Sequence, residues 1–140
     1  MQTLYTAEAL ATGEGRTGSA RTSDGKLEVT LAPPKEMGGT GEGTNPEQLF
    51  AAGYAACFHS ALRLVGKKAG ANIDDSAVGA QVSIGPNAEG GFQLAVTLEI
   101  TLPHLPTPEA QTLAHQAHQV CPYSNATRNN IDVQLNVTQD

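Results

Sequence analysis

The sequence predicts an α+β fold in which antiparallel sheets pack around one long buried helix. Stretches of alternating apolar and polar residues occur in pairs joined by short turns, which is typical of antiparallel hairpins. Residues 49–58 are apolar on every face of a helix, which is typical of a buried helix. The helical segments fall between groups of strands, and this favours α+β architecture over a doubly wound parallel sheet.

The first third of the chain contains three expected strands. Residues 2–12 and 17–23 have mixed strand character and flank the turn-prone GEGRTG, so we expect a loose hairpin with Arg16 at its turn. Residues 26–31 alternate and predict a half-buried strand. The glycine-rich loop at 35–44 lacks the Walker pattern, which argues against a phosphate cradle there.

Clear boundary signals define the long helix at residues 45–70. Asn45 can cap its N-terminus, Pro46 suits the first helical position, and the Gln48 side chain can reach back to the cap. Gly70 supplies a stop at the other end.

The second half of the chain predicts a hairpin, two helices and a final strand. Residues 78–84 and 92–102 alternate on either side of a turn. Residues 108–120 predict a second helix, and CPYSNATR at 121–128 can form a short third one. Residues 131–137 alternate as the last strand.

Length and composition place the chain in a broad class. Its 140 residues predict one domain, residues 1–140. A formal net charge of -6 without a Lys/Arg cluster argues against a nucleic-acid partner. The polar residues His59, Ser60 and Arg63 interrupt an apolar run that is shorter than the about 20 residues of a membrane span, so we expect no membrane partner. The residues after Met1 lack the pattern of a signal peptide, so we expect a cytoplasmic protein.

Cys57, near the middle of the long helix, is the first candidate for chemistry. It could simply fill the core, where burial would raise its pKa and make it inert. It lies about 18 Å along the helix from the Asn45 cap, beyond the reach of the helix dipole. A reactive Cys57 therefore needs a cation from elsewhere, and Arg16, at a glycine-flanked turn, is the most plausible of the eight Lys and Arg residues. Such an arginine would itself need a carboxylate to orient it.

Cys121 offers two alternatives. It precedes Pro122 at the expected start of a short helix, where partial positive charge favours the thiolate. It also completes an H-x-x-H-x-x-C pattern with His115 and His118, which could hold zinc on one helix face. The break at Pro122 disturbs that geometry, so we expect no metal.

Three segments resemble a known family. NPEQLFAAGYAACF surrounds Cys57, CPYSNATRNNIDV begins at Cys121, and the opening LYTAEALATGEGRTG contains Arg16. Together they resemble the organic hydroperoxide resistance (Ohr) branch of the Ohr/OsmC family over essentially the whole chain. The resemblance implies an OsmC-like fold in an intertwined homodimer.

The resemblance also implies a thiol peroxidase, an organic hydroperoxide reductase without cofactor or metal. Cys57 matches the peroxidatic cysteine, Cys121 the resolving cysteine, Arg16 the activating arginine, and Glu47 the carboxylate that holds it. Family members are cytoplasmic homodimers with active sites at the subunit interface. They reduce alkyl and fatty-acid hydroperoxides to alcohols through a sulfenic acid and a disulfide, and dihydrolipoamide or lipoylated proteins recycle them.

Two expectations concern the surroundings of Cys57. Phe50 and Tyr54 lie on roughly its helix face and could either line an apolar pocket for an alkyl chain or pack in the core. Glu47 is about 15 Å from Cys57 along a straight helix and on another face. If Arg16 contacts both, the helix bends or Glu47 comes from the partner subunit, and we expect the latter.

Two other functions stay open from the sequence. A non-enzymatic redox sensor or lipid-hydroperoxide binding module could use the same cysteines, although the chain has no DNA-reading helix or basic patch. A zinc-binding structural domain could use the H-x-x-H-x-x-C set.

Overall fold

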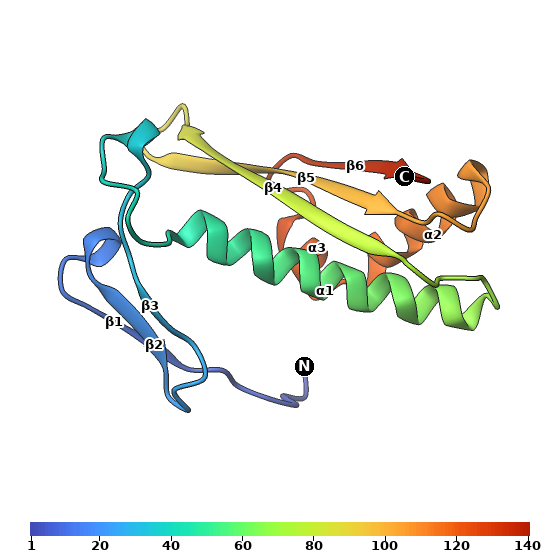
Figure 1. The fold of residues 1–140 in the computed structure, drawn as a ribbon, viewed down its shortest axis with the longest axis horizontal. Helices are drawn as coiled ribbons and strands as arrows, with labels where there is room; N and C mark the ends of the chain where they lie inside the picture. The colour runs from blue at the N-terminus through green and yellow to red at the C-terminus, as the bar shows by residue number, and fades with distance from the viewer. The chain divides into compact units, whose positions relative to one another are not determined.

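The structure, a computed structural model, describes residues 1–140. It divides into two compact units, Met1–Leu49 and Phe50–Asp140. Figure 1 shows the helices and strands along the chain. In order they are β1 (Ala9–Thr12), the 3-10 helix η1 (Gly15–Thr17), β2 (Ser19–Thr22), β3 (Glu28–Thr30), the 3-10 helix η2 (Lys35–Met37), α1 (Pro46–Lys68), β4 (Ala77–Pro86), β5 (Phe92–Thr101), α2 (Thr107–Val120), α3 (Pro122–Thr127) and β6 (Val133–Thr138).

The first unit is built on a three-stranded antiparallel sheet in the order β1–β2–β3. This confirms the N-terminal hairpin, in which Ala9 pairs with Thr22 and η1 carries Arg16 at the turn. The two strands are shorter than residues 2–12 and 17–23. All the side chains of β1 are exposed, so this strand buries nothing within the chain.

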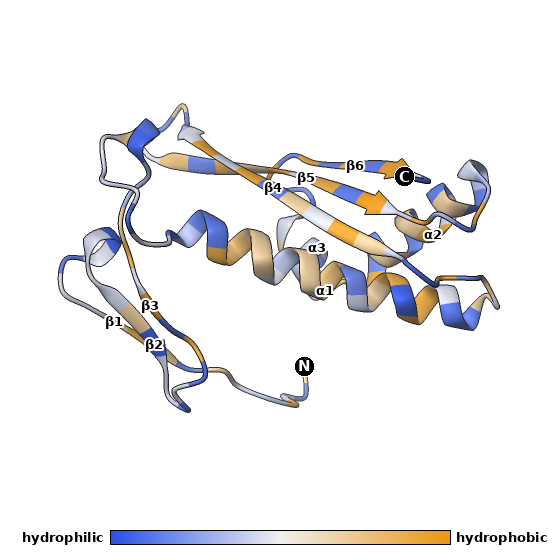
Figure 2. Ribbon diagram, viewed as in Figure 1, coloured by the Kyte–Doolittle hydropathy of each residue, from blue (hydrophilic) through white to orange (hydrophobic).

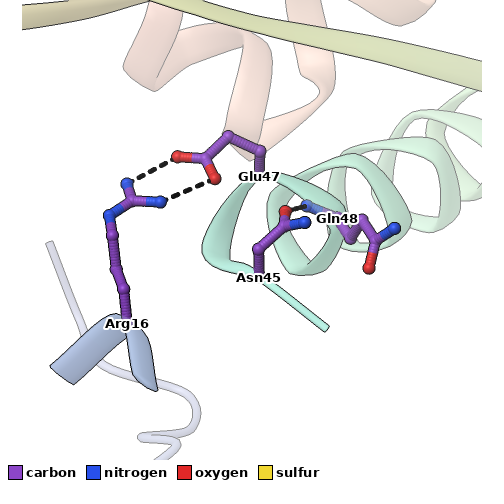
Figure 3. A network of polar contacts seen from close by, with 4 residues as sticks. All are labelled: Arg16, Asn45, Glu47 and Gln48. Carbon is purple, nitrogen blue, oxygen red and sulfur yellow. Dashed lines mark hydrogen bonds and ion pairs between the residues drawn. The ribbon is translucent and has the colours of Figure 1, made fainter. Parts of the chain in front are cut away.

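α1 begins and ends where the sequence signals place it. The Asn45 side chain accepts the Gln48 backbone N–H at 2.8 Å, as Figure 3 shows, and so caps the helix. The Gln48 side chain differs from expectation, because it accepts a hydrogen bond from the Thr44 hydroxyl at 2.7 Å instead of reaching back to the cap. At the other end Gly70 adopts φ +67°, the left-handed conformation of a helix stop, and its N–H bonds the Lys67 carbonyl.

The expectation that α1 is covered on every face is wrong for the single chain. One stripe is buried, with the spacing of three and four residues that marks one helix face. It consists of Tyr54, Phe58, Ala61, Leu62 and Gly66. The far side exposes Ala52, Ala56 and Ser60, although the middle of α1 is largely apolar (Figure 2). A single sheet layer covers only one side of a helix, so the small residues on the other side stay uncovered.

By length and composition α1 is the one helix in the chain that could cross a membrane. The core helix of a soluble protein passes the same test, so the observation is weak evidence for a membrane span. His59 and Ser60 near its middle and Arg63 beyond them place polar groups where a span is apolar, which favours packing within protein.

The second unit contains a mixed sheet in the order β4–β5–β6. β4 and β5 form the expected long hairpin, paired from Ala77 and Thr101 to Pro86 and Phe92. β6, however, runs parallel to β5, which corrects the expectation of purely antiparallel sheets. The reason is the connection between the two strands. In the sequence, α2 and α3 come between β5 and β6, and such a helical crossover allows parallel pairing.

The hydrophobic core of the second unit lies between its sheet and its helices (Figure 1). β5 contributes one alternating face, Val96, Leu98 and Ile100, and the buried stripe of α1 and the inner face of α2 complete the core. Cys121 is a fully buried member of this core, whereas Cys57 packs at its margin. The core therefore holds one thiol inside and one at the edge.

Candidate active site

The two cysteines of the chain meet in the second unit. The Cys121 thiol donates to the Cys57 sulfur, with 3.6 Å between the two Sγ atoms, although the residues are 64 positions apart in sequence. Both are free thiols, Cys57 partly exposed and Cys121 completely buried. A small movement would bring the sulfurs to the about 2 Å of a disulfide bond. Of the two, Cys57 is the thiol that a molecule from solvent can reach.

Cys121 lies at the corner between α2 and α3. Its N–H bonds the Ala117 carbonyl at 2.9 Å and ends α2, while its carbonyl accepts the Asn125 N–H at 3.0 Å and begins α3. Pro122 has no N–H to continue the ladder of α2, so the chain turns there. This confirms the expected place of Cys121 at the start of a short helix, and hydrogen bonds on both sides fix its backbone.

The surroundings of Cys57 in the second unit favour the neutral thiol. Burial raises the pKa of Cys57 above its ordinary value, and the neighbouring Cys121 sulfur adds to the rise. The backbone N–H of Tyr123, in the first turn of α3, hydrogen-bonds the Cys57 sulfur and opposes the rise in pKa without cancelling it. A thiolate at neutral pH therefore still requires a cation.

Arg16 and Glu47 form a bidentate ion pair in the first unit (Figure 3). Arg16 Nη2 donates to Glu47 Oε1 at 2.6 Å, and Nη1 donates to Oε2 at 2.9 Å. The hydrogen bonds lower the pKa of Glu47 and raise that of Arg16, so both groups are charged at neutral pH. The Arg16 side chain remains 40% exposed, which leaves donors of the guanidinium free for another anion.

Arg16 and Glu47 pair within one chain. The expectation that Glu47 comes from a partner subunit concerned an Arg16 that also contacts Cys57, so it stays a prediction. η1 supplies the arginine and the first turn of α1 supplies the carboxylate. The two charges therefore form one preassembled group.

Three aromatic rings cluster in the second unit next to the cysteines. The ring centroid of Tyr123 lies 5.8 Å from that of Phe50 and 5.6 Å from that of Tyr54. Phe50 is partly buried and Tyr123 is 38% exposed. Tyr54 is completely buried, which favours the packing role over the pocket role for its ring. The rings of Phe50 and Tyr123, which are not fully buried, therefore provide the apolar surface that a bound molecule could contact.

A family model described as OsmC-like protein matches residues 39–136 of the chain. The organic hydroperoxide resistance protein of Xanthomonas axonopodis pv. citri is 52% identical over 134 residues, which cover 94% of this chain and 93% of that protein. The chain belongs to the OsmC-like family. Organic hydroperoxide resistance protein OhrB of Bacillus subtilis is another relative, 44% identical over 132 residues that cover 94% and 96% of the two chains. Within the OsmC-like family, these similarities are to the Ohr branch.

Solved structures of the Ohr branch share the fold. The crystal structure of an organic hydroperoxide resistance protein from Elizabethkingia anophelis matches with a TM-score of 0.95 and 50% identity over 100% of both chains. The crystal structure of Bacillus subtilis OhrB matches with a TM-score of 0.88 and 45% identity, covering 97% of this chain and 100% of that one. The comparisons confirm both the OsmC-like α+β fold and the resemblance noted in the sequence.

The sequence did not single out several side chains beside the thiols of this OsmC-like chain. Tyr123 was not identified, although it follows Pro122 in the CPYS motif. Ser124 and Thr127 are buried on the inner face of α3, where their spacing of one helical turn was the available signal. His118 was considered as a metal ligand or as a residue that suits a helix end, and its Nδ1 contacts the Ser124 hydroxyl at 2.8 Å.

The alternative zinc set is not assembled in this OsmC-like chain. No group of three or more His, Cys, Asp or Glu side chains gathers as metal ligands. Cys121 faces Cys57, and His118 faces Ser124. Two residues of H-x-x-H-x-x-C, Cys121 and His118, therefore make separate contacts.

Gly53 of α1 leaves room for the Tyr123 ring. A Cβ at this position would lie 2.9 Å from Tyr123 Oη, which is too close, and 3.3 Å from its Cε2, which is tighter than most such contacts. We expect Gly53→Ala to displace this ring and slow the reaction of Cys57 with an alkyl hydroperoxide several-fold. The fold should survive, because alanine favours a helix by up to about 1 kcal/mol over glycine. Stopped-flow rates and a thermal melt would test both statements.

A compensating change provides the control for Gly53→Ala. Adding Tyr123→Phe removes the hydroxyl oxygen that makes the shortest contact, so the double variant should recover part of the lost rate. If the single variant reacts as fast as the natural protein, the Tyr123 ring has no role in the reaction.

Proposed function

We propose that the protein is a cysteine-based organic hydroperoxide reductase, with Cys57 as the peroxidatic and Cys121 as the resolving thiol. The observation that carries the proposal is the thiol pair, with one partly exposed sulfur 3.6 Å from a buried one. The names of the Ohr relatives support the substrate class. A redox sensor would use the same pair, and turnover separates the two functions.

The chemistry proceeds in three balanced steps. The Cys57 thiolate attacks the terminal oxygen of ROOH, an S–O bond forms as the O–O bond breaks, and the alkoxide takes a proton to leave as ROH. The Cys121 sulfur then attacks the Cys57 sulfenic acid, forming the S–S bond and releasing water. A dithiol reopens this disulfide by exchange, is itself oxidised to a disulfide, and returns two protein thiols.

The proposed role of the Arg16–Glu47 pair is to stabilise the Cys57 thiolate. Burial raises the pKa of Cys57, so a positive charge has to lower it if the thiol is to react at neutral pH. Glu47 occupies two donors of the guanidinium and fixes its plane, which leaves other donors for the thiolate and the peroxide oxygen.

We propose that the active protein is a cytoplasmic homodimer in which residues 1–140 act as one domain and the active sites lie at the interface. The uncovered small residues of α1, Ala52 and Ala56, would allow close backbone approach. Large apolar side chains such as Leu4 and Leu10 are exposed in the first unit. A second copy would remove both surfaces from water.

The substrate class follows from the rings beside the thiols. Phe50 and Tyr123 offer apolar surface next to Cys57, whereas Tyr54 supports them from the core. Such surface adds binding free energy for an alkyl or fatty-acyl chain in proportion to the area buried, and none for hydrogen peroxide. We therefore propose organic hydroperoxides as the preferred substrates.

One assay tests the proposal. The protein is mixed with cumene hydroperoxide or with hydrogen peroxide, using dihydrolipoamide, the dithiol of lipoylated proteins, as the reductant. We expect many turnovers, with a higher kcat/KM for the organic peroxide. Oxidation of the thiols once, without further turnover, would favour the redox sensor and contradict the enzyme.

A further inference from the structure

The short helix α3 packs inward through hydroxyl groups. Its buried residues are Ser124 and Thr127, and both contact the Tyr54 hydroxyl, at 2.8 and 3.0 Å. His118 of α2 completes the group, with its Nδ1 2.8 Å from Ser124 Oγ. A helix of 6 residues cannot hold itself in water. These contacts therefore help to fix α3 and with it Cys121, which precedes its first turn.

The hydrogen bonds of this group run in one consistent direction. The Thr127 hydroxyl donates to the Ser124 carbonyl at 3.2 Å, so it accepts from the Tyr54 hydroxyl. Since a hydroxyl donates once, Tyr54 accepts from Ser124, which in turn accepts from His118 Nδ1–H. No buried polar side-chain atom lacks a partner. Removing one member leaves a buried neighbour unpaired, which is costly.

The hydroxyl contact and the thiol contact share one spacing on both helices. On α1, Tyr54 precedes Cys57 by three positions, and across from them Ser124 follows Cys121 by three. The two contacts therefore lie about 4.5 Å apart along α1, somewhat less than one helical turn. A fixed Tyr54–Ser124 contact sets the register in which the sulfurs face each other.

We propose that Tyr54, Ser124 and His118 are positioning residues that hold α3 in the register where Cys121 can close on Cys57. The kinetic meaning of this role rests on the proposed function. In the dithiol form these hydrogen bonds hold the register, whereas in the disulfide form the covalent bond does. Without the network, closing the bond loses more conformational freedom, so the effective concentration of one thiol for the other falls.

The test is a thiol–disulfide equilibrium that needs no peroxide. Two glutathione molecules reduce the protein disulfide to two thiols and become glutathione disulfide, and the ratio of protein forms gives the effective concentration. Tyr54→Phe keeps the ring and removes the hydroxyl. We expect its effective concentration to fall about tenfold, equivalent to about 30 mV in reduction potential. Thr112→Val removes an exposed hydroxyl of α2 that donates to the Pro108 carbonyl at 3.1 Å, and this control should match the natural protein.

Two substitutions of His118 separate positioning from packing. Asparagine presents an amide N–H close to the place of Nδ1–H, so His118→Asn should keep most of the effective concentration. Leucine has no donor, so His118→Leu should lose about tenfold. An equal loss in both variants would contradict the donor role of His118.

A folded Tyr54→Phe protein with an unchanged glutathione equilibrium would overturn the proposal. If Tyr54→Phe does not fold, Ser124→Ala takes its place and must show the same shift. The expected shift in a protein that does not turn over peroxide would contradict the proposed function while supporting the positioning role.

Discussion

Cys57→Ser is expected to reduce peroxide consumption to the rate measured without protein. Serine has nearly the same shape, but its hydroxyl is not ionised at neutral pH and cannot form the sulfenic acid on which the cycle depends. The natural protein exposes Cys57 and buries Cys121, so no second thiol can replace it toward solvent. The measurement is consumption of cumene hydroperoxide with dihydrolipoamide. Turnover above the protein-free rate would contradict the role of Cys57.

Cys121→Ser is the matched control, because it removes the other sulfur of the same contact. We expect the first oxidation to keep its natural rate, since Cys57 is still present. The sulfenic acid should then persist and be trapped by dimedone, with no intramolecular disulfide in the mass spectrum. A lost first oxidation with an intact fold would instead make Cys121 the peroxidatic thiol.

If Arg16 stabilises the Cys57 thiolate as proposed, Arg16→Ala should slow the oxidation of Cys57 about a hundredfold at neutral pH, because removing such a cation raises a thiol pKa by about two units. Burial already raises the pKa of Cys57. The thiolate fraction falls about tenfold for each pH unit below the pKa. The rate of the variant should therefore keep rising into the alkaline range, where the natural protein has reached its plateau. Stopped-flow oxidation rates as a function of pH test this.

Arg21→Ala is the control for charge alone, because Arg21 is an exposed arginine of β2, the strand that follows η1, and has no ion pair. Its profile should match that of the natural protein. Glu47→Gln keeps a hydrogen-bond acceptor for Arg16 but removes the carboxylate. Its oxidation rate should therefore lie between those of Arg16→Ala and the natural protein. If Arg16→Ala has the same pH profile as the natural protein, another group activates Cys57.

The parts of the fold that depend on local sequence were predicted well. Asn45 and Gly70 delimit α1 because caps and stops act within one turn. The direction of β6 was not predicted, because the pattern of residues 131–137 marks a strand without naming its partner. The uncovered face of α1 was not predicted for a related reason. An apolar pattern predicts that a face is buried, but it does not say whether the same chain or another chain buries it.

The residues of the candidate site were predicted from two sources. The two cysteines and Arg16 were candidates from the sequence itself, whereas Glu47 and the pairing of the two thiols came from the family resemblance, because no spacing rule brings residues 64 positions apart to 3.6 Å. Ser124 and Thr127 were not predicted to lie in the site, because hydroxyl residues in a short helix usually face water. Their burial depends on a tyrosine hydroxyl contributed by a helix 70 residues away in sequence, which only the tertiary fold can reveal.

The separation of 64 positions between the thiols also bears on the stability of the whole chain. A bond between them would close a loop of almost half the sequence and restrict the unfolded chain, which in the chain-entropy account is worth about 4 kcal/mol. In the proposed cycle, each turnover would form this bond and break it again. Oxidised molecules would be harder to unfold and to digest than reduced ones, so the proposed disulfide would prolong the lifetime of the protein.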